Sequence, residues 1–345
     1  MSSTGAAVRL SSDRARDLAA SLLEAAGASE ADADAVARSL VAAERAGHAG
    51  HGLARLPGYL GRLRSGGTVS GPWRLVRSTG PVESYDGAAG LGHVHLELAV
   101  ERAAALAVEH GAGIVGVSHS NHGGALGTRA RALAERGLIG ILATNAPAVL
   151  APPGGTRAVV GTNPLALAAP VPGGPPLVCD LATSQVSRGQ IMRAVQEDRP
   201  IPAGWALDAE GRPTEDAAAA LAGTLMPLGG PKGFALALLI EVITGVLLGP
   251  AVGPEVADFF GDELDRPQDV AHLVVALDPA AFGESAAFAG RMGRLRDAVL
   301  AAGPPGATRM PGSRTAAGEQ VTLPPGLSSR LATLAGELGV TPPDA

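Results

Sequence analysis

The chain has 345 residues, of which 46% are hydrophobic and 17% charged, a composition typical of a folded globular protein with one or two domains. The net charge of −6 argues against nucleic-acid binding, because no basic face could neutralise many phosphates. Cys179 is the only cysteine, which excludes an intrachain disulfide and indicates a reducing compartment, by default the cytoplasm. The most apolar segment, residues 234–249, is short and carries Glu241, so we predict a buried helix and no membrane span.

The N-terminal part of the chain has the spacing of helices. Leucine and alanine recur at helical intervals over about residues 12–27 and 29–47. Ser12 and Ser29 stand where a helix cap is expected, and a shorter helical stretch follows at 53–67. We therefore predict a helical N-terminal unit.

From about residue 72, short apolar runs bounded by glycine and proline alternate with helical segments. The predicted strands are 73–78, 82–87, 114–119, 138–144, 165–171, 177–182 and 272–278, and the predicted helices are 94–110, 124–136, 185–197, 233–248, 285–301 and 327–338. This order predicts an α/β domain over residues 76–299, and a helical domain over 1–75 that the C-terminal segment 300–345 joins.

A match to the dinucleotide-binding pattern G-x-G-x-x-G occurs at Gly111, Gly113 and Gly116. In a Rossmann domain this pattern follows a strand and opens a helix, so that helix amides face the pyrophosphate. Here the order is reversed, because a helix ends at these glycines and a strand follows. We interpret Gly111 as the end of that helix and the match as an accident.

The next segment, "SHSNHGGALG", joins a predicted strand to a predicted helix. His119, Asn121 and His122 precede its two glycines, and free backbone amides at such a junction suit a phosphate or a carboxylate. A polar turn with a capping asparagine explains the segment equally well. Asn121 also belongs to a small set, since it shares residues 121–163 with the other two asparagines of the chain, Asn145 and Asn163.

A second polar segment, "GHAGHGLARLPGYL", contains His48 and His51 in a break between helices. If residues 51–63 are helical, His51, Arg55 and Tyr59 share one face. An imidazole that moves a proton, one turn from a guanidinium that grips a carboxylate, suits a small acid substrate. A solvated helix face with a capping histidine is the alternative.

Three more junctions carry polar residues. Thr162 precedes a strand, and Asp180 ends one and can cap the following helix or contact a ribose. Lys232, the only lysine, opens the apolar helix, where its charge opposes the helix dipole, so we favour an anion-binding role. We predict no metal site, because the pair His93-x-His95 has no acidic or cysteine partners nearby.

Together these segments resemble the malate/L-lactate dehydrogenase family. The matching stretches are "GHAGHGLARLPGYL", "SHSNHGGALG", "LIGILATNAP", "APPGGTRAVVGTNPLALAAP", "DLATSQVSRGQI", "IPAGWALDAEGRPTED", "LMPLGGPKGFALAL", "HLVVALDPAAF" and, more weakly, "MPGSR". The resemblance implies a non-Rossmann NAD(P)-binding α/β domain plus a discontinuous helical domain, as in L-sulfolactate dehydrogenase-like proteins. It also implies a homodimer that interconverts a small 2-oxo acid and a 2-hydroxy acid with NAD or NADP.

By this resemblance, His51 is the proton donor and Arg55 holds the substrate carboxylate, while Thr162 and His272 contact the substrate. A hydride reaches C2 of the substrate from the nicotinamide, and His51 protonates the developing alkoxide. The implied cofactor-binding residues are His122, Gly123, Gly124, Ala125, Leu126, Asp180, Leu181, Ala182, Lys232, Gly312, Ser313 and Arg314.

The chain departs from the family at several positions, including "PPGG" in place of Pro-Trp-Gly-Gly. Gly50 replaces a serine that orients the histidine in some members, Gln190 stands where others have Asp or Lys, and Ser313 replaces a glutamate. The imino-acid reductases have Asp at the position of Gln190. Two alternatives therefore remain beside the 2-hydroxy acid reading: a cyclic imino acid (pyrroline/piperideine-2-carboxylate) reductase, and a catalytically weak cofactor-binding paralogue.

Overall fold

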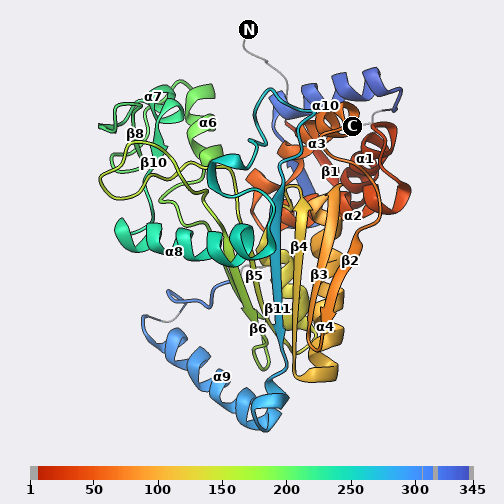
Figure 1. Cartoon of the computed structure of the whole chain (residues 1–345), viewed down its shortest axis with the longest axis vertical. Coiled ribbons are helices and arrows are strands. Elements are labelled where there is room, and N and C mark those ends of the chain that lie inside the picture. Colours follow the sequence, from red (N-terminus) through yellow and green to blue (C-terminus); the bar gives the residue numbers. More distant parts are fainter. Residues whose placement is uncertain (1–6, 305, 314–317, 342–345) are drawn as a thin grey trace.

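The computed structural model describes residues 7–304, 306–313 and 318–341 and is built around a seven-stranded sheet with the order β2-β3-β4-β11-β5-β6-β7 (Figure 1). Strands β3 and β4 run parallel, and the other pairs described in this sheet are antiparallel. The strands are β2 (Arg74–Thr79), β3 (Val82–Gly90), β4 (Ala112–Ser120), β5 (Ile139–Thr144), β6 (Leu165–Ala169), β7 (Leu177–Leu181) and β11 (Val270–Leu277). A Rossmann sheet is mostly parallel, so the predicted non-Rossmann α/β fold is confirmed.

Helices cover both faces of this sheet. Helices α4 (Gly92–His110) and α5 (Leu126–Glu135) pack on one face and form the main core with β4, β5, β6 and β11. On the other face, α8 (Pro231–Glu241) continues into a π-helical turn, Val242–Val246, which contacts β11 (Figure 1). The ends of the strands next to the first helices of the chain are therefore enclosed from both sides.

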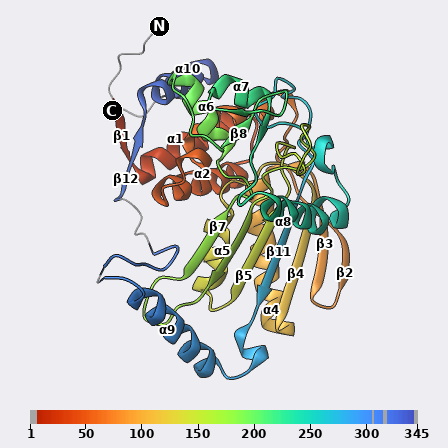
Figure 2. The same ribbon diagram turned by 90° about the vertical axis from the view of Figure 1, so that its left-hand side faces the viewer.

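A second core joins the two ends of the chain. Helices α1 (Ser12–Ala25), α2 (Glu30–Arg45) and α3 (Leu56–Ser65) pack with α10 (Pro325–Leu338) around buried leucines. Strand β1 (Val8–Ser11) pairs antiparallel with β12 (Gln320–Leu323) beside them (Figure 2). The exact domain boundaries at residues 75 and 300 stay a prediction.

A third, smaller cluster lies next to α8. It contains α6 (Arg188–Gln196), α7 (Ala217–Ala222) and a three-stranded sheet of β8 (Ala206–Leu207), β9 (Pro213–Thr214) and β10 (Thr224–Leu225). Helix α9 (Ser285–Ala301) has no buried residue and lies at the opposite end of the molecule from the N-terminal helices (Figures 1 and 2).

The apolar segment 234–249 is helical as predicted, but it is buried on one face only. Five of its residues are between 47% and 65% exposed, namely Leu238, Leu239, Val242, Val246 and Leu247. The buried face carries Glu241, which accepts hydrogen bonds from Asn163 Nδ2 (2.7 Å) and from the amide of Gly253 (2.8 Å). Within the described ranges, no helix is long and apolar enough to cross a membrane.

The three glycines of the G-x-G-x-x-G match have structural tasks. Gly111 ends α4 with φ +82°, the left-handed conformation that a helix often takes at its C-terminus. A Cβ atom at Gly113 would clash with the carbonyl oxygen of Ala103, and one at Gly116 with Leu248. The glycines therefore end a helix and allow close packing on β4, as the interpretation of an accidental match requires.

All three asparagines are buried and fix the loops around the ends of the strands. Asn121 donates to the carbonyl of Ala89 (2.7 Å) and accepts from the amide of Gln268 (2.9 Å). Asn145 accepts from the amide of Ala271 (2.8 Å), and Asn163 from that of Ala146 (3.0 Å). Buried backbone groups that have no ladder partner must bond elsewhere, so these side chains hold the loops in place.

Candidate active site

The segment with the predicted proton donor is not one continuous helix. Two short 3-10 turns, Ala49–His51 and Leu53–Arg55, carry the histidine and the arginine before α3 begins. The carboxylate of Glu44 accepts the amide proton of Leu53 (2.9 Å), and a Cβ atom at Gly52 would clash with that carboxylate. The condition of one continuous helix over residues 51–63 is therefore not met at its start, where Glu44 binds the backbone between the two turns.

The Arg55 side chain is positioned for an anion. Its Nε donates to the carbonyl of Gly50 (2.6 Å), and its guanidinium lies 4.2 Å from the ring centroid of Phe260 and 5.4 Å from that of Phe259. In the described part of the chain, its two Nη atoms have no hydrogen-bond partner. Burial lowers the pKa of Arg55 and the nearby carboxylate of Asp258 opposes this, but an arginine remains charged in proteins. The free edge of the guanidinium suits a carboxylate.

His51 lies parallel to a second imidazole. Its ring centroid is 5.5 Å from that of His122, with an interplanar angle of 10°. The Nδ1 atom of His51 is buried and has no hydrogen-bond partner among the described residues. Burial, and then the charges of Arg55 and His48, lower the pKa of His51 to about 4. His51 is therefore neutral at pH 7 in the absence of an anion.

His122 ends a chain of buried hydrogen bonds. Its Nδ1 atom bonds to the hydroxyl of Tyr59, which also bonds to Nε2 of His93 (2.8 Å). The Nδ1 atom of His93 bonds in turn to the hydroxyl of Ser39 (2.8 Å), and the backbone amide of His122 donates to Gln268 (3.0 Å). Burial is the largest cause that lowers the pKa values of His93 and His122 well below the usual range, and burial raises that of Tyr59.

Three of the four stretches with predicted cofactor-binding residues come together beside β7. The amide of Gly127, at the start of α5, donates to Asp180 at the end of β7 (2.7 Å). Arg131 of α5 donates to the carbonyl of Gly312 (2.7 Å). Lys232 is exposed in the first turn of α8. Ser313 is half-buried, and Arg314 lies outside the described residues.

These residues fit a dinucleotide. Ala125 caps α5 without a side-chain hydrogen bond, so the amides at the helix start are available for a phosphate, except that of Gly127, which donates to Asp180. The carboxylate of Asp180 is of the type that bonds ribose hydroxyls, and burial raises its pKa. Gly124 has φ +78°, and a Cβ atom there would clash with the ring of His93. The turn therefore presents bare backbone next to the imidazoles of the site.

The two predicted substrate contacts differ in exposure. Thr162 is half-buried, and its carbonyl accepts hydrogen bonds from the amide and the hydroxyl of Thr183 (both 2.8 Å). His272 is completely buried on β11, where Nε2 bonds to the hydroxyl of Ser120 (3.0 Å) and the carbonyl of Asn121 (3.1 Å). Burial lowers its pKa to about 3. His272 supports the turn before α5 from below, and its contact with substrate stays a prediction.

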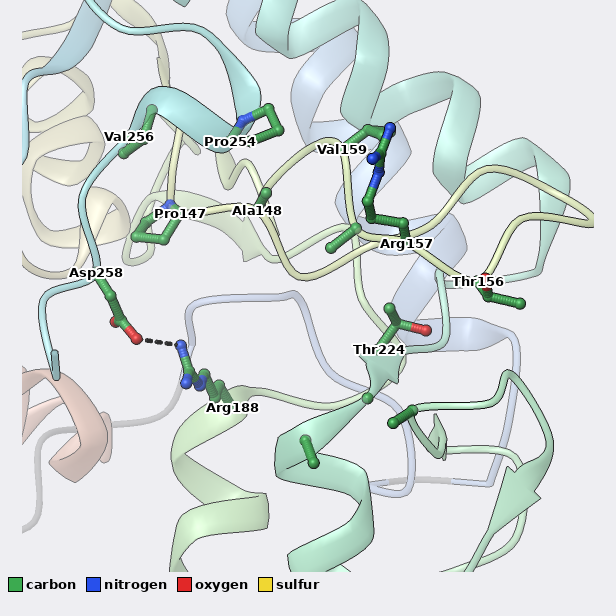
Figure 3. A pocket seen from close by; sticks show the side chains of 14 residues that line it. Pro147, Ala148, Thr156, Arg157, Val159, Arg188, Thr224, Pro254, Val256 and Asp258 are labelled. Carbon is green, nitrogen blue, oxygen red and sulfur yellow. Dashed lines mark hydrogen bonds and ion pairs between the residues drawn. The ribbon is translucent and has the colours of Figure 1, made fainter.

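A cavity of about 700 Å³ is lined by Arg188 and Asp258, among other residues (Figure 3). Its wall includes Arg188, whose Nη1 is 2.6 Å from Oδ2 of Asp258. Asp258 directly precedes the two phenylalanines that stack on Arg55. One short loop therefore lines the cavity and also contacts Arg55. The remaining lining includes Pro147, Ala148, Thr156, Arg157, Thr224 and Val256.

Sequence reasoning missed several of these residues and misplaced one. Nothing in a single sequence relates Ser39 or Phe260 to the site, although the pair His93-x-His95 was visible as an isolated signal. His119 does not join His122, because it has φ +49°, is exposed and pairs with Asp269 (2.8 Å). The polar junction "SHSNHGG" therefore sends its two histidines to different places.

A guanidinium with no partner on its Nη atoms among the described residues, a neutral histidine and a turn of bare backbone lie close together, an arrangement compatible with a dehydrogenase site. The profile of the malate/L-lactate dehydrogenase family matches residues 10–333. The chain is 42% identical over 315 residues to the (2R)-3-sulfolactate dehydrogenase (NADP(+)) of Chromohalobacter salexigens, covering 90% of this chain and 93% of the relative. It is 36% identical over 274 residues (79% and 81%) to the Delta(1)-pyrroline-2-carboxylate/Delta(1)-piperideine-2-carboxylate reductase of Pseudomonas aeruginosa.

Solved structures agree with the sequence relatives. The sulfolactate dehydrogenase from Methanocaldococcus jannaschii superimposes with a TM-score of 0.87 at 30% identity, over 97% of this chain and 98% of that one. The chain therefore belongs to the malate/L-lactate dehydrogenase family, and the resemblance predicted from the sequence is confirmed. The expectation of a nicotinamide-dependent dehydrogenase is confirmed at the level of the family.

Proposed function

We propose that the protein interconverts a small 2-oxo acid and the matching 2-hydroxy acid with NAD or NADP. Arg55 binds the substrate carboxylate, and His51 gives a proton to the substrate oxygen during reduction and takes it back during oxidation. The observation that carries this proposal is that the charge of Arg55 acts on the buried His51, while the Nη atoms of Arg55 have no hydrogen-bond partner among the described residues. Thr162 and His272 complete the proposed substrate contacts.

The protonation state of His51 depends on the bound anion. Arg55 is the neighbouring charge that contributes most to its lowered pKa. A carboxylate bound to Arg55 offsets that charge and favours the protonated imidazole, which is the form that reduction needs. Before substrate binds, the ring is neutral, which is the form that accepts a proton during oxidation of a hydroxy acid. Arg55 also holds the carboxylate in one orientation, so the reacting carbon is fixed.

The proposed cofactor contacts are the turn from His122 to Leu126, the strand end from Asp180 to Ala182, Lys232, and the loop with Gly312, Ser313 and Arg314. When bound there, the nicotinamide supplies or accepts the hydride. The exposed Lys232 and the amides at the start of α5, other than that of Gly127, support binding of the phosphates. One relative is named for NADP(+) and another for NAD(+), so the test uses both cofactors.

The relatives suggest two substrate classes. One acts on a 3-sulfolactate and another on cyclic imino acids. We favour the 2-hydroxy acid, because the imino-acid branch has an aspartate where this chain has Gln190, which is exposed on α6. The cyclic imino acid reductase and a catalytically weak cofactor-binding paralogue are the alternatives.

The test is a panel of 2-oxo acids and Δ1-pyrroline-2-carboxylate with NADH and NADPH, followed at the absorbance of the reduced cofactor. We expect turnover of at least one 2-oxo acid and a loss of about 100-fold or more in kcat for His51→Ala. Turnover of the imino acid alone would favour the reductase, and cofactor binding without turnover the weak paralogue. Full turnover by His51→Ala would show that His51 is not the proton donor.

Assembly and location are further proposals. We propose a homodimer that covers the apolar face of α8, because a monomer rarely exposes so many neighbouring apolar side chains. Light scattering should show half the mass for Leu239→Glu, while Val108→Glu, on the exposed surface of α4, keeps the mass of the native protein. We place the protein in the cytoplasm on the basis of its one cysteine, which is a free thiol.

A further inference from the structure

The hydrogen-bond chain behind His122 contains two residues with no assigned task, Ser39 and His93. Both are buried, on α2 and α4 respectively, and neither has contact with solvent that a substrate could use. We propose that Ser39 and His93 are positioning residues for the reaction: acting through Tyr59, they fix the tautomer and orientation of His122, and His122 in turn holds the ring of His51. This inference rests on the proposed role of His51.

The direction of the chain follows from the hydroxyl of Ser39. Among the described residues, its only hydrogen-bond partner is Nδ1 of His93. A buried hydroxyl proton needs an acceptor, so Ser39 donates to that nitrogen, and His93 then carries its proton on Nε2. Nε2 of His93 donates to the oxygen of Tyr59, whose own proton goes to Nδ1 of His122. His122 is thereby held as the tautomer with a proton on Nε2.

The ring of His51 needs this support, because its own buried nitrogen has none. Nδ1 of His51 has no hydrogen-bond partner in the described ranges, and the preceding residue, Gly50, has no side chain to offer one. The nearly parallel ring of His122 is the aromatic surface against which His51 lies. Parallel, offset aromatic rings at this separation attract each other. A fixed His122 therefore restricts the rotation of His51.

The space around Gly50 allows a test of whether His51 depends on His122 for its orientation. A Cβ atom at Gly50 would meet nothing within 4 Å. The Gly50→Ser variant therefore places a hydroxyl next to His51 without a clash. If the hydrogen-bond chain from Ser39 to His122 orients His51, removing one of its bonds should lower kcat less when a serine at position 50 provides a second support.

The first measurement is the tautomer of His122 by 15N nuclear magnetic resonance on the full chain, without cofactor or substrate. We expect a proton on Nε2 and a bare Nδ1 in the native protein. Ser39→Ala and His93→Gln should each change the Nδ1 signal of His122. Thr244→Val, which removes a buried hydroxyl bonded to its own helix at Ile240, should leave that signal unchanged.

The second measurement is turnover in a double-mutant cycle. We expect His93→Leu to lower kcat about tenfold with KM changed less than about threefold, since one buried hydrogen bond is lost away from the substrate. Ser39→Ala should have a smaller effect in the same direction. In the Gly50→Ser background, both losses should shrink, and His93→Gln should recover part of the loss because its amide can still donate to Tyr59. Thermal melting shows whether each variant folds.

Three results would overturn the proposal. One is a native His122 with its proton on Nδ1, and another is a His122 signal that neither Ser39→Ala nor His93→Gln alters. The third is a loss of kcat that is equally large with and without the Gly50→Ser substitution. If no 2-oxo acid is turned over at all, the proposed function fails, whereas the spectroscopic measurement still decides whether the chain fixes His122.

Discussion

Two clusters of buried histidine and serine lie on either side of one glycine pair. The first runs through Ser39, His93 and Tyr59 to His122, and the second joins His95 and His272 through the hydroxyl of Ser120. Helix α4 supplies a histidine to each cluster, two residues apart. A Cβ atom at Gly124 would clash with His93, and one at Gly123 would lie 3.3 Å from His272.

The two clusters are alike in burial and in the direction of their pKa values. Burial lowers the pKa of His95 to about 4 and that of His272 to about 3, just as it lowers that of His93. They differ in where they end. The first ends at His122, which is half-buried beside His51, whereas both histidines of the second are sealed in the core. A shifted pKa therefore marks burial in both clusters, and only the open end distinguishes the site.

The largest difference between the clusters should appear in a matched pair of substitutions. We expect His51→Asn to lower kcat about 100-fold or more with an unchanged melting temperature. We expect His95→Asn to destabilise the fold by about 2–4 kcal/mol, because it leaves a cavity and removes the hydrogen bond between His95 and the buried hydroxyl of Ser120, with kcat of the folded enzyme nearly unchanged. Turnover and urea unfolding measure the two effects. A stable His95→Asn protein without activity would contradict the division.

The second effect is a loss of stability at low pH that arises in the buried cluster of His95 and His272. The pKa of His95 is about 4 in the folded protein and near 6.5 when unfolded. The unfolded chain therefore binds more protons below pH 6.5, so stability falls as the pH drops from 6.5 towards 4, by roughly 3 kcal/mol from this residue alone. Urea unfolding between pH 7 and pH 4 checks this, and His95→Asn should flatten the dependence. If the free energy of unfolding of His95→Asn depends on pH as strongly as that of the native protein, another group causes the dependence.

Much of the fold could be predicted from the sequence, because periodicity reports local structure. The helices near 285–301 and 92–110 and the strand near 270–277 follow directly from the spacing of apolar residues. The exposed face of α8 could not be predicted in this way, since an apolar helix looks the same in sequence whether protein or solvent lies beside it. The break at Gly52 was missed because Glu44, eight residues earlier, causes it.

The site could be predicted only in part. His51, Arg55 and His122 stand in recognisable segments, whereas Ser39, His93 and Phe260 reach the site through tertiary packing. The same dependence on tertiary packing misplaced His119, because a positive φ turns the chain between it and His122. A single sequence shows the residues of such a network, but it does not show the tertiary contacts that connect them.

A smaller effect is expected from the glycine pair that separates the clusters. Gly124→Ala forces a left-handed backbone on alanine, at a cost of about 1 kcal/mol, and presses on His93. It should lower kcat about tenfold if the position of His93 matters to the site. Gly123→Ala presses instead on Leu96 in the main core and should mainly lower the melting temperature. Equal kcat for the two variants would argue against a division of tasks at this turn.

The smallest effect concerns His272, which the family resemblance assigns to the substrate and the structure buries beneath the turn. His272→Gln keeps a side-chain donor for the carbonyl of Asn121 and exposes no new surface. We expect KM for the best 2-oxo acid to change less than about twofold, because a side chain without exposed surface makes no direct contact. Steady-state kinetics with the saturating cofactor measures KM. A rise of about tenfold or more at unchanged stability would instead mean that the turn opens on binding and brings His272 to the substrate, which would move this residue from the sealed cluster to the site.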